Sequence, residues 1–137
     1  MIFLDLTKAY DALDRSRCLG ILEGYGVGPG ARRLLQNYWR RLTMAARAGG
    51  YYGAAFKGAR GVTQGDSLSP TIFNVVVDAV VRHWLEGLQN ANEEKGAAGG
   101  GYFSAVFYAD DGMVGASEPS WLQGAFSSLV AIFDRLC

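Results

Sequence analysis

The segment SLSPTIFNVVVDAVVRHWLEGL, residues 67–88, has the composition of a helix that other elements must cover. Ser69 is a suitable N-cap, and Pro70 suits the first helical position. Apolar residues then recur on nearly every side, so we expect this helix to be largely buried. On its polar side Asp78 precedes Arg82 at i,i+4 spacing, which indicates a structural ion pair. The remaining elements must therefore be arranged around this helix.

Other segments have the patterns of the strands and helices that could cover it. Apolar runs predict strands, apolar residues at helical spacing predict helices, and glycine-rich stretches predict loops. We expect strands at residues 1–4, 102–108 and 113–116, short glycine-punctuated strands within 48–61, helices at about 14–25 and from Pro119 onward, and a loop at 90–101. Strands and helices mixed in this order, with antiparallel hairpins, indicate the α+β class.

A further helix is predicted after the chain break GVGPG at residues 26–30. One of its faces is apolar and contains Leu34, Leu35, Tyr38, Trp39 and Leu42. A second face is polar and contains Arg32, Gln36, Arg40, Thr43 and Arg47. The polar face is either an ordinary solvated surface or, in a nucleic-acid-binding protein, a row of phosphate contacts.

Length and charge distribution narrow the possible function. The chain has 137 residues, half of them hydrophobic, which suits a single domain spanning 1–137. The formal net charge is zero, but residues 24–65 hold seven basic residues and no acidic one, whereas the rest holds six basic and thirteen acidic residues. Such asymmetry suits a polyanion on one surface and metal ions on another.

Cysteine content and hydropathy give a weaker indication of location. Two cysteines, Cys18 and Cys137, form no disulfide framework, which favours a reducing, intracellular setting. The N-terminal MIFLDL lacks the basic region of a signal peptide, and the longest apolar runs are too short to span a membrane. We therefore expect a soluble intracellular protein without a membrane partner. His83, the only histidine, lies within the long helix pattern and is expected to be structural.

The segment VFYADDGMVG, residues 106–115, places two adjacent carboxylates between two strand-forming runs. In one interpretation Asp111 and Gly112 form the hairpin turn, with Gly112 at positive φ and Asp110 simply solvated. In the other, the hairpin holds two carboxylates that repel each other unless a hard divalent cation lies between them. The local sequence leaves both interpretations open.

Three features in a fixed order resemble the palm of reverse transcriptases. They are FLDLTKAYDALDR (3–15), RGVTQGDSLSPTIFNVV (60–76) and FYADD (107–111). The sequences of these three motifs are most similar to those of the enzymes of non-LTR (LINE-type) retrotransposons, followed by those of group II introns. The resemblance implies a palm-like antiparallel sheet packed on helices, with the fingers and thumb largely outside this chain.

The resemblance also implies a reaction, RNA-directed DNA synthesis by nucleotidyl transfer with two metal ions. Asp5 and Asp110 would be the principal ligands of two Mg²⁺ ions, with Asp111 assisting, and Mn²⁺ could substitute. Hard cations of this kind prefer oxygen ligands. The implied partners are an RNA template, a DNA primer and deoxynucleoside triphosphates. Oligomeric state is not implied.

Further roles follow from the same resemblance. Tyr10 would be the steric gate that excludes a ribose 2′-hydroxyl, although a core aromatic would have the same sequence signal. The remaining implied nucleotide contacts are Leu6, Lys8, Ala9, Gln64 and Gly65. The phosphates of the template–primer hybrid would meet Arg32, Arg40, Arg47 and Arg60. Asp11, Asp14 and Asp66 are expected to be caps or turn residues.

Other interpretations remain open at the level of sequence. An RNA-directed RNA polymerase or a nucleotide cyclase would also use two metal ions. A degenerate retroelement remnant would be a nucleic-acid-binding or structural module. Ser67 stands where many reverse transcriptases have proline, a departure that removes no ligand. With fingers and thumb absent, we expect the isolated chain to polymerise poorly or not at all.

Overall fold

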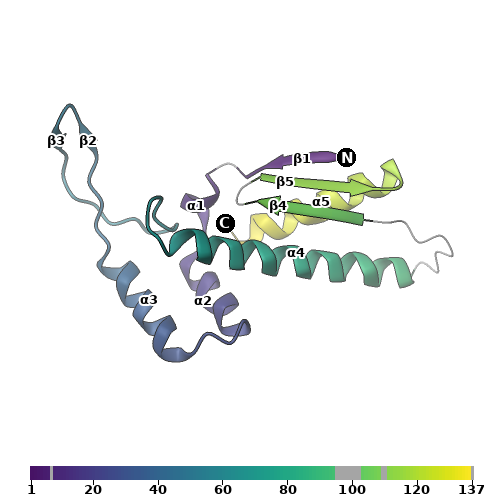
Figure 1. Cartoon of the computed structure of the whole chain (residues 1–137), viewed down its shortest axis with the longest axis horizontal. Coiled ribbons are helices and arrows are strands. Elements are labelled where there is room, and N and C mark those ends of the chain that lie inside the picture. Colours follow the sequence, from purple (N-terminus) through teal and green to yellow (C-terminus); the bar gives the residue numbers. More distant parts are fainter. Residues whose placement is uncertain (7, 95–102, 109–110, 137) are drawn as a thin grey trace.

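The computed structural model describes residues 1–6, 8–94, 103–108 and 111–136, which form helices and an antiparallel sheet (Figure 1). The elements are β1 (Ile2–Asp5), α1 (Ala9–Ala12), α2 (Arg15–Gly24), α3 (Pro29–Arg41), β2 (Arg47–Ala48), β3 (Tyr51–Tyr52), α4 (Ser69–Glu94), β4 (Phe103–Tyr108), β5 (Asp111–Ala116) and α5 (Pro119–Leu136). The predicted α+β class, with a palm-like antiparallel sheet packed on helices, is confirmed.

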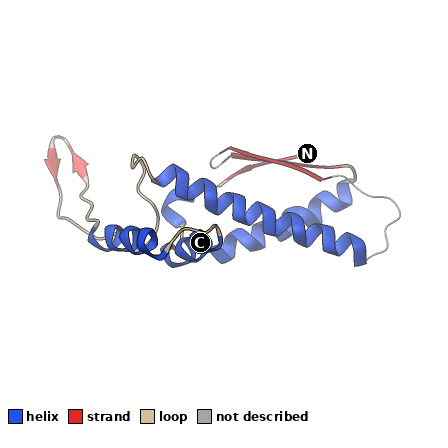
Figure 2. Ribbon diagram, turned by 60° about the horizontal axis from the view of Figure 1, so that its bottom comes forward, coloured by secondary structure: helices blue, strands red, loops and turns tan. Residues whose placement is uncertain are grey.

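The main sheet has the order β1-β5-β4, and both pairings are antiparallel. In Figure 2 the sheet forms one layer and the helices lie together on one side of it. The buried residues between the layers come from α4, β5 and α5: Val80, Trp84, Val114, Ala125 and Leu129. The opposite face of the sheet is left open, and this open face includes the exposed side chains of Phe3 and Val106.

Trp84 joins the two long helices beneath the sheet. Its ring is almost fully buried. Its indole N–H donates a hydrogen bond of 2.9 Å to the carbonyl of Ala125 and lies 2.9 Å from the hydroxyl oxygen of Ser128. A buried indole needs such a partner, because an unsatisfied donor in an apolar core costs free energy. The contact fixes α5 against α4 at one position.

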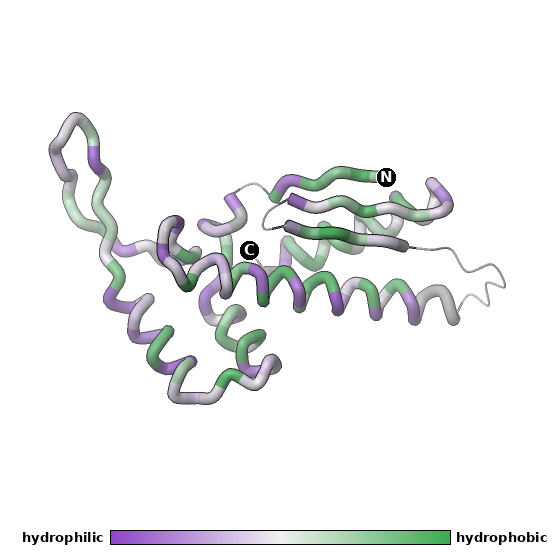
Figure 3. Tube along the Cα trace, viewed as in Figure 1, coloured by the Kyte–Doolittle hydropathy of each residue, from purple (hydrophilic) through white to green (hydrophobic). Residues whose placement is uncertain are grey.

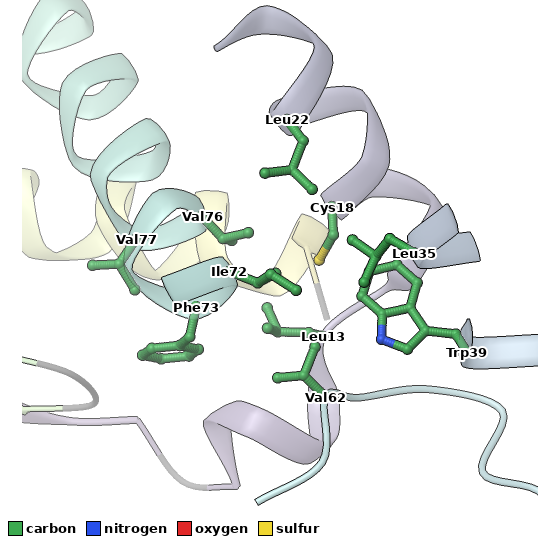
Figure 4. Close-up of a cluster of buried hydrophobic side chains, with 10 residues drawn as sticks. All are labelled: Leu13, Cys18, Leu22, Leu35, Trp39, Val62, Ile72, Phe73, Val76 and Val77. Atoms are coloured by element: carbon green, nitrogen blue, oxygen red, sulfur yellow. The ribbon is translucent and has the colours of Figure 1, made fainter. Parts of the chain in front are cut away.

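A second core lies where α2 and α3 meet the first half of α4. Ten buried residues form it, as Figure 4 shows: Leu13, Cys18, Leu22, Leu35, Trp39, Val62, Ile72, Phe73, Val76 and Val77. Because Ile72 and Phe73 contribute to this core whereas Val80 and Trp84 contribute to the other, α4 connects both. The prediction that this helix is largely buried holds for its apolar side chains, whereas Arg82, His83 and Glu86 are exposed.

The C-terminal part of α4 differs from the prediction. Residues 90–94 were expected in a loop but continue the helix to Glu94, and residues 95–101 lie outside the described residues. The sequence QNANEE contains Ala, Gln and Glu, which have high helix propensity, so it extends the helix that precedes it. The predicted ion pair is present: Arg82 lies 2.7 Å from Asp78, whose other interaction is with the hydroxyl of Tyr25.

Asp14 caps α2, as predicted. Its carboxylate accepts hydrogen bonds from the backbone N–H groups of Ser16 (2.8 Å) and Arg17 (3.0 Å). These bonds satisfy donors that a helix N-terminus otherwise leaves unpaired. The hydroxyl of Ser16, followed by the N–H of Arg17, lowers the pKa of the Asp14 carboxyl.

Helix α3 is shorter than the sequence pattern predicted. It ends at Arg41, and Leu42 is extended, so Thr43 and Arg47 do not belong to its polar face. Instead the chain enters a two-stranded ribbon, because the backbone groups of residues 44–48 bond to those of 51–56. The apolar face is also narrower than expected: Leu35 and Trp39 are buried, but Leu34 is 73% exposed.

Gly61 joins the segment after β1 to the segment before α4. Its N–H donates to the Leu13 carbonyl, and the N–H of Val62 donates to the Tyr10 carbonyl, each over 2.8 Å. Gly61 has a φ of 79°, and a Cβ there would lie 2.7 Å from the backbone of Asp11. Only glycine combines this backbone conformation with so close an approach.

Arg15 reinforces the same junction. Its guanidinium donates to the carbonyls of Gly61 and Gly58, each over 2.8 Å, and lies 5.8 Å from the centroid of the Trp39 ring. Partial burial lowers the pKa of this guanidinium. One side chain thus connects α2, α3 and the segment that leads to α4.

We predict that Gly61→Ala lowers the free energy of unfolding by about 2–5 kcal/mol, because the left-handed conformation and the overlap with the Asp11 backbone both add cost. Gly65→Ala is the matched control, since Gly65 has a φ of 89° but a Cβ there would meet nothing within 4 Å. It should cost about 1–2 kcal/mol. Urea denaturation measures both, and equal losses would contradict the role given to the backbone contact.

Candidate functional site

The site is built around two carboxylates on the open face of the sheet. Strand β1 ends at Asp5 and β5 begins at Asp111, and these two residues are direct partners across the strands. Residues directly opposite each other in an antiparallel pair have their side chains on the same face. Both residues are exposed. In Figure 3 the strands become hydrophilic at this end of the sheet.

The position of these carboxylates is electrostatically unfavourable without a cation. Like charges directly opposite in a sheet destabilise it, and a hard divalent cation between two carboxylates would remove that cost. Asp110, the other principal predicted ligand, lies outside the described residues. Within the described residues, no three His, Cys, Asp or Glu side chains come close enough together to hold a metal ion.

The structure shows whether Asp111 and Gly112 lie in the hairpin turn or in a strand. Tyr108 pairs with Asp111, so Asp111 and Gly112 belong to β5, and the prediction that they form the turn is wrong. Gly112 is buried opposite Phe107, and a Cβ on Gly112 would lie 2.5 Å from the Phe107 ring. Gly112 is therefore needed for space beneath an aromatic ring rather than for a positive φ.

Tyr10 belongs to α1, the helix that follows β1, and another aromatic ring supports it. Its ring stacks on Phe73 of α4, with centroids 4.5 Å apart and an interplanar angle of 16°. It lines a groove of about 560 Å³ whose other walls include Asn74 of α4 and Tyr108 of β4. Tyr108, the cross-strand partner of Asp111, is 84% exposed. Tyr10 is thus a half-buried ring at the wall of an open groove.

Gln64 lines a different cavity, of about 290 Å³, together with Asp11, Arg60 and Gly61. Gln64 itself is exposed. Val62 lines this cavity and Tyr10 lines the groove, and the backbones of these two residues are hydrogen-bonded to each other. The structure therefore brings the segment of Gln64 next to that of Tyr10 but gives the two side chains separate cavities.

Leu6 and Lys8 lie in the segment that connects β1 to α1. Leu6 is half-buried and packs against the second core. Lys8 has a φ of 55°, a left-handed conformation that is rare for a residue with a side chain and often marks a functional segment. Its carbonyl accepts hydrogen bonds from Asp11 and Ala12 at the start of α1.

The four arginines predicted to meet phosphates lie on α3, on β2 and in the segment before α4. Arg32 is ion-paired with Glu23 at 2.7 Å and also donates to the Val27 carbonyl, which gives it a structural role between α2 and α3. Arg40 is exposed near the end of α3, and Arg47 is exposed on β2. Arg60 lines the cavity of Gln64.

Several residues of the site have no clear signal in the sequence. The pattern places Phe73 only on a buried helix face, and it indicates no role for Arg15 or Tyr108. Asp66, expected at a turn, accepts hydrogen bonds from the N–H of Leu68 (3.1 Å) and the hydroxyl of Tyr38 (2.9 Å), and the bond with Tyr38 raises the pKa of that tyrosine. Most of these contacts join segments distant in sequence, so no local pattern signals them.

Comparisons with known proteins cover almost the whole chain. The family model for reverse transcriptase (RNA-dependent DNA polymerase) matches residues 1–135. The retrovirus-related Pol polyprotein from type-2 retrotransposable element R2DM of Drosophila melanogaster is 33% identical over 121 residues, 88% of this chain. That from type-1 retrotransposable element R2 of Nasonia vitripennis is 32% identical over 128 residues, 93% of the chain. The chain spans only 11% and 12% of these relatives.

The comparisons and the helices bear on two further expectations. Similarity to R2 elements supports the predicted likeness to non-LTR retrotransposons. No helix in the described part of the chain is long and apolar enough to cross a membrane.

We predict that Asp5→Asn and Asp111→Asn each stabilise the metal-free chain at low ionic strength, by about 0.2–1 kcal/mol, because each removes the repulsion across the strands. The double variant provides the control. If the two carboxylates repel each other, neutralising the second adds little once the first is neutral. Thermal unfolding in EDTA at low and high salt measures the effect, and purely additive gains would argue against the cross-strand repulsion.

Proposed function

The chain belongs to the reverse transcriptase family, and from this premise we propose that it provides the catalytic palm of an RNA-directed DNA polymerase. The observation that carries the proposal is the direct pairing of Asp5 with Asp111 on the open sheet face. Tyr10 lines a groove that also includes Tyr108, the cross-strand partner of Asp111. In this proposal Asp5 and Asp110 are the principal ligands of two Mg²⁺ ions, for which Mn²⁺ can substitute, and Asp111 assists.

The carboxylates suit the chemistry of nucleotidyl transfer. Bound by these carboxylates, two metal ions would activate a primer 3′-hydroxyl and neutralise the charge of the transferred phosphoryl and the departing pyrophosphate. Asp5 and Asp111 reach one face from adjacent strands, so their oxygens can be held at a spacing set by the sheet. A rigid ladder is a better support for such ligands than a loop, because it fixes their positions before substrate arrives.

Tyr10 is proposed as the residue that selects deoxynucleotides. Its stacking on Phe73 restrains the ring on one side, so the ring cannot withdraw into the core to admit a 2′-hydroxyl. Backbone groups of Leu6, Lys8 and Ala9 are proposed to meet the triphosphate, and Gln64 and Gly65 to approach the incoming nucleotide. An exposed glycine at positive φ lets the backbone come close to a ligand.

The proposed partners are an RNA template, a DNA primer and deoxynucleoside triphosphates. Arg40, Arg47 and Arg60 are the arginines proposed to meet backbone phosphates. Such contacts give sequence-independent binding that weakens with salt. Arg32 remains a weaker candidate because Glu23 already neutralises it.

The proposal predicts that Mg²⁺ and Mn²⁺ bind the chain in the presence of a primer–template and a deoxynucleotide, and that the binding is lost in Asp110→Asn and strongly weakened in Asp5→Asn. Isothermal titration calorimetry measures this. Asp134→Asn is a matched control, since Asp134 is an exposed carboxylate on α5, and it should bind metal as the unmodified chain does. Metal binding that survives in Asp5→Asn and Asp110→Asn alike would refute the assignment.

A second prediction concerns sugar selection. Tyr10→Ala should reduce the preference for a deoxynucleotide over the matching ribonucleotide by roughly 10-fold, the scale of one steric contact in a binding pocket. Tyr10→Phe should keep the preference, because the ring and its stacking on Phe73 remain. Competition binding in the presence of Mn²⁺ and primer–template gives both ratios. A preference for ribonucleotides in the unmodified chain would instead favour an RNA-directed RNA polymerase.

A further inference from the structure

A two-stranded ribbon, residues 44–56, extends from the end of α3 away from the sheet and the long helices (Figure 1). Met44 and Phe56 exchange two backbone hydrogen bonds of 2.8 Å at its base. Arg47–Ala48 pairs with Tyr51–Tyr52 at its tip. Isolated hairpins are marginally stable in water, so a projecting ribbon of this kind needs a reason to be kept.

The tip of the ribbon, residues 47–52, exposes its side chains. Gly49 and Gly50 have φ values of 56° and 86°, the positive values that a two-residue hairpin turn requires. The turn itself therefore has no side chains. The two tyrosines that follow it, Tyr51 and Tyr52, are 83% and 71% exposed.

The exposed rings are combined with positive charge. The guanidinium of Arg47 lies 5.5 Å from the centroid of the Tyr52 ring, a cation–π contact at the surface. Lys57 follows the ribbon, and Arg40 and Arg41 precede it at the end of α3, all exposed. No acidic residue occurs between residues 24 and 65. This charge is complementary to a polyanion.

Flat exposed rings beside cations are the groups that bind single-stranded nucleic acids. Every base has a π-face, so stacking on tyrosine is tolerant of sequence, and the neighbouring cations follow the phosphates. Tyrosine is also common at protein–protein interfaces, but seven basic residues and no acidic one in residues 24–65 match a row of phosphates better than the mixed charges of a protein surface. The observations therefore favour nucleic acid as the occupant.

We propose that the 44–56 ribbon binds single-stranded nucleic acid, with bases stacked on Tyr51 and Tyr52 and phosphates near Arg47 and Lys57. The proposal deepens the proposed function and rests on it for the identity of the strand, which would be the unpaired template at a distance from the carboxylates. The stacking contact itself requires no metal ion. Stacking can therefore be measured in EDTA, which keeps metal ions out of the site.

The test uses the whole chain in EDTA with fluorescently labelled oligouridylate and oligothymidylate. The double variant Tyr51→Ala/Tyr52→Ala should lose at least about 5-fold in affinity, because stacking contributes about 1–3 kcal/mol per base. The matched variant Tyr51→Phe/Tyr52→Phe keeps both rings and should bind within about twofold of the unmodified chain. Fluorescence anisotropy gives the affinities, and quenching of a 2-aminopurine base reports stacking directly.

The outcomes separate this proposal from the others. Loss of affinity and of quenching in the alanine variant, but not in the phenylalanine variant, supports it, and unequal losses for the two oligonucleotides tell whether RNA or DNA is preferred. Unchanged affinity in the alanine variant overturns the proposal. This holds even if the substitution changes the sedimentation coefficient of the chain. Because the measurement is made in EDTA, failure of the metal-site proposal would leave it intact.

Discussion

The structure depends on the backbone contact between Gly61–Val62 and the segment Tyr10–Leu13. Two hydrogen bonds there connect the residues that follow β1 to those that lead into α4. Without this contact the Tyr10 ring would not be held against Phe73, and the segment of Gln64 would not lie beside α1. Both the tertiary fold and the position of the candidate nucleotide contacts therefore follow from one close approach of two backbones.

The elements that could be predicted from sequence are those with a strong local pattern. The helix around Phe73 and Trp84, the strands on either side of Asp110 and the cap at Asp14 all have periodic or capping signals, and all are confirmed where the chain is described. One error arose where a pattern continued past its structural end. Arg47 continues the polar helical spacing of α3 but belongs to a ribbon, because cross-strand hydrogen bonds outweigh helix propensity there.

The candidate site could be predicted only in part, for a different reason. Asp5 and Asp111 lie in recognisable motifs. Their direct pairing, however, depends on the register of the sheet, which no local pattern specifies. Arg15 gives no signal because its acceptors are the carbonyls of Gly58 and Gly61, and backbone acceptors leave no trace in residue identity. The role of Gly112 could not be predicted because the ring that needs the space, Phe107, lies on another strand.

The pairing of β1 with β5 also has a consequence for folding. Its two strands are far apart in sequence, with over a hundred residues between Asp5 and Asp111. Closing so long a loop costs entropy that only later contacts repay, so pairings of this kind form late and slow the folding rate. During synthesis on the ribosome, β1 would emerge long before its partner strand exists. The carboxylates would thus come together only after most of the chain had been made.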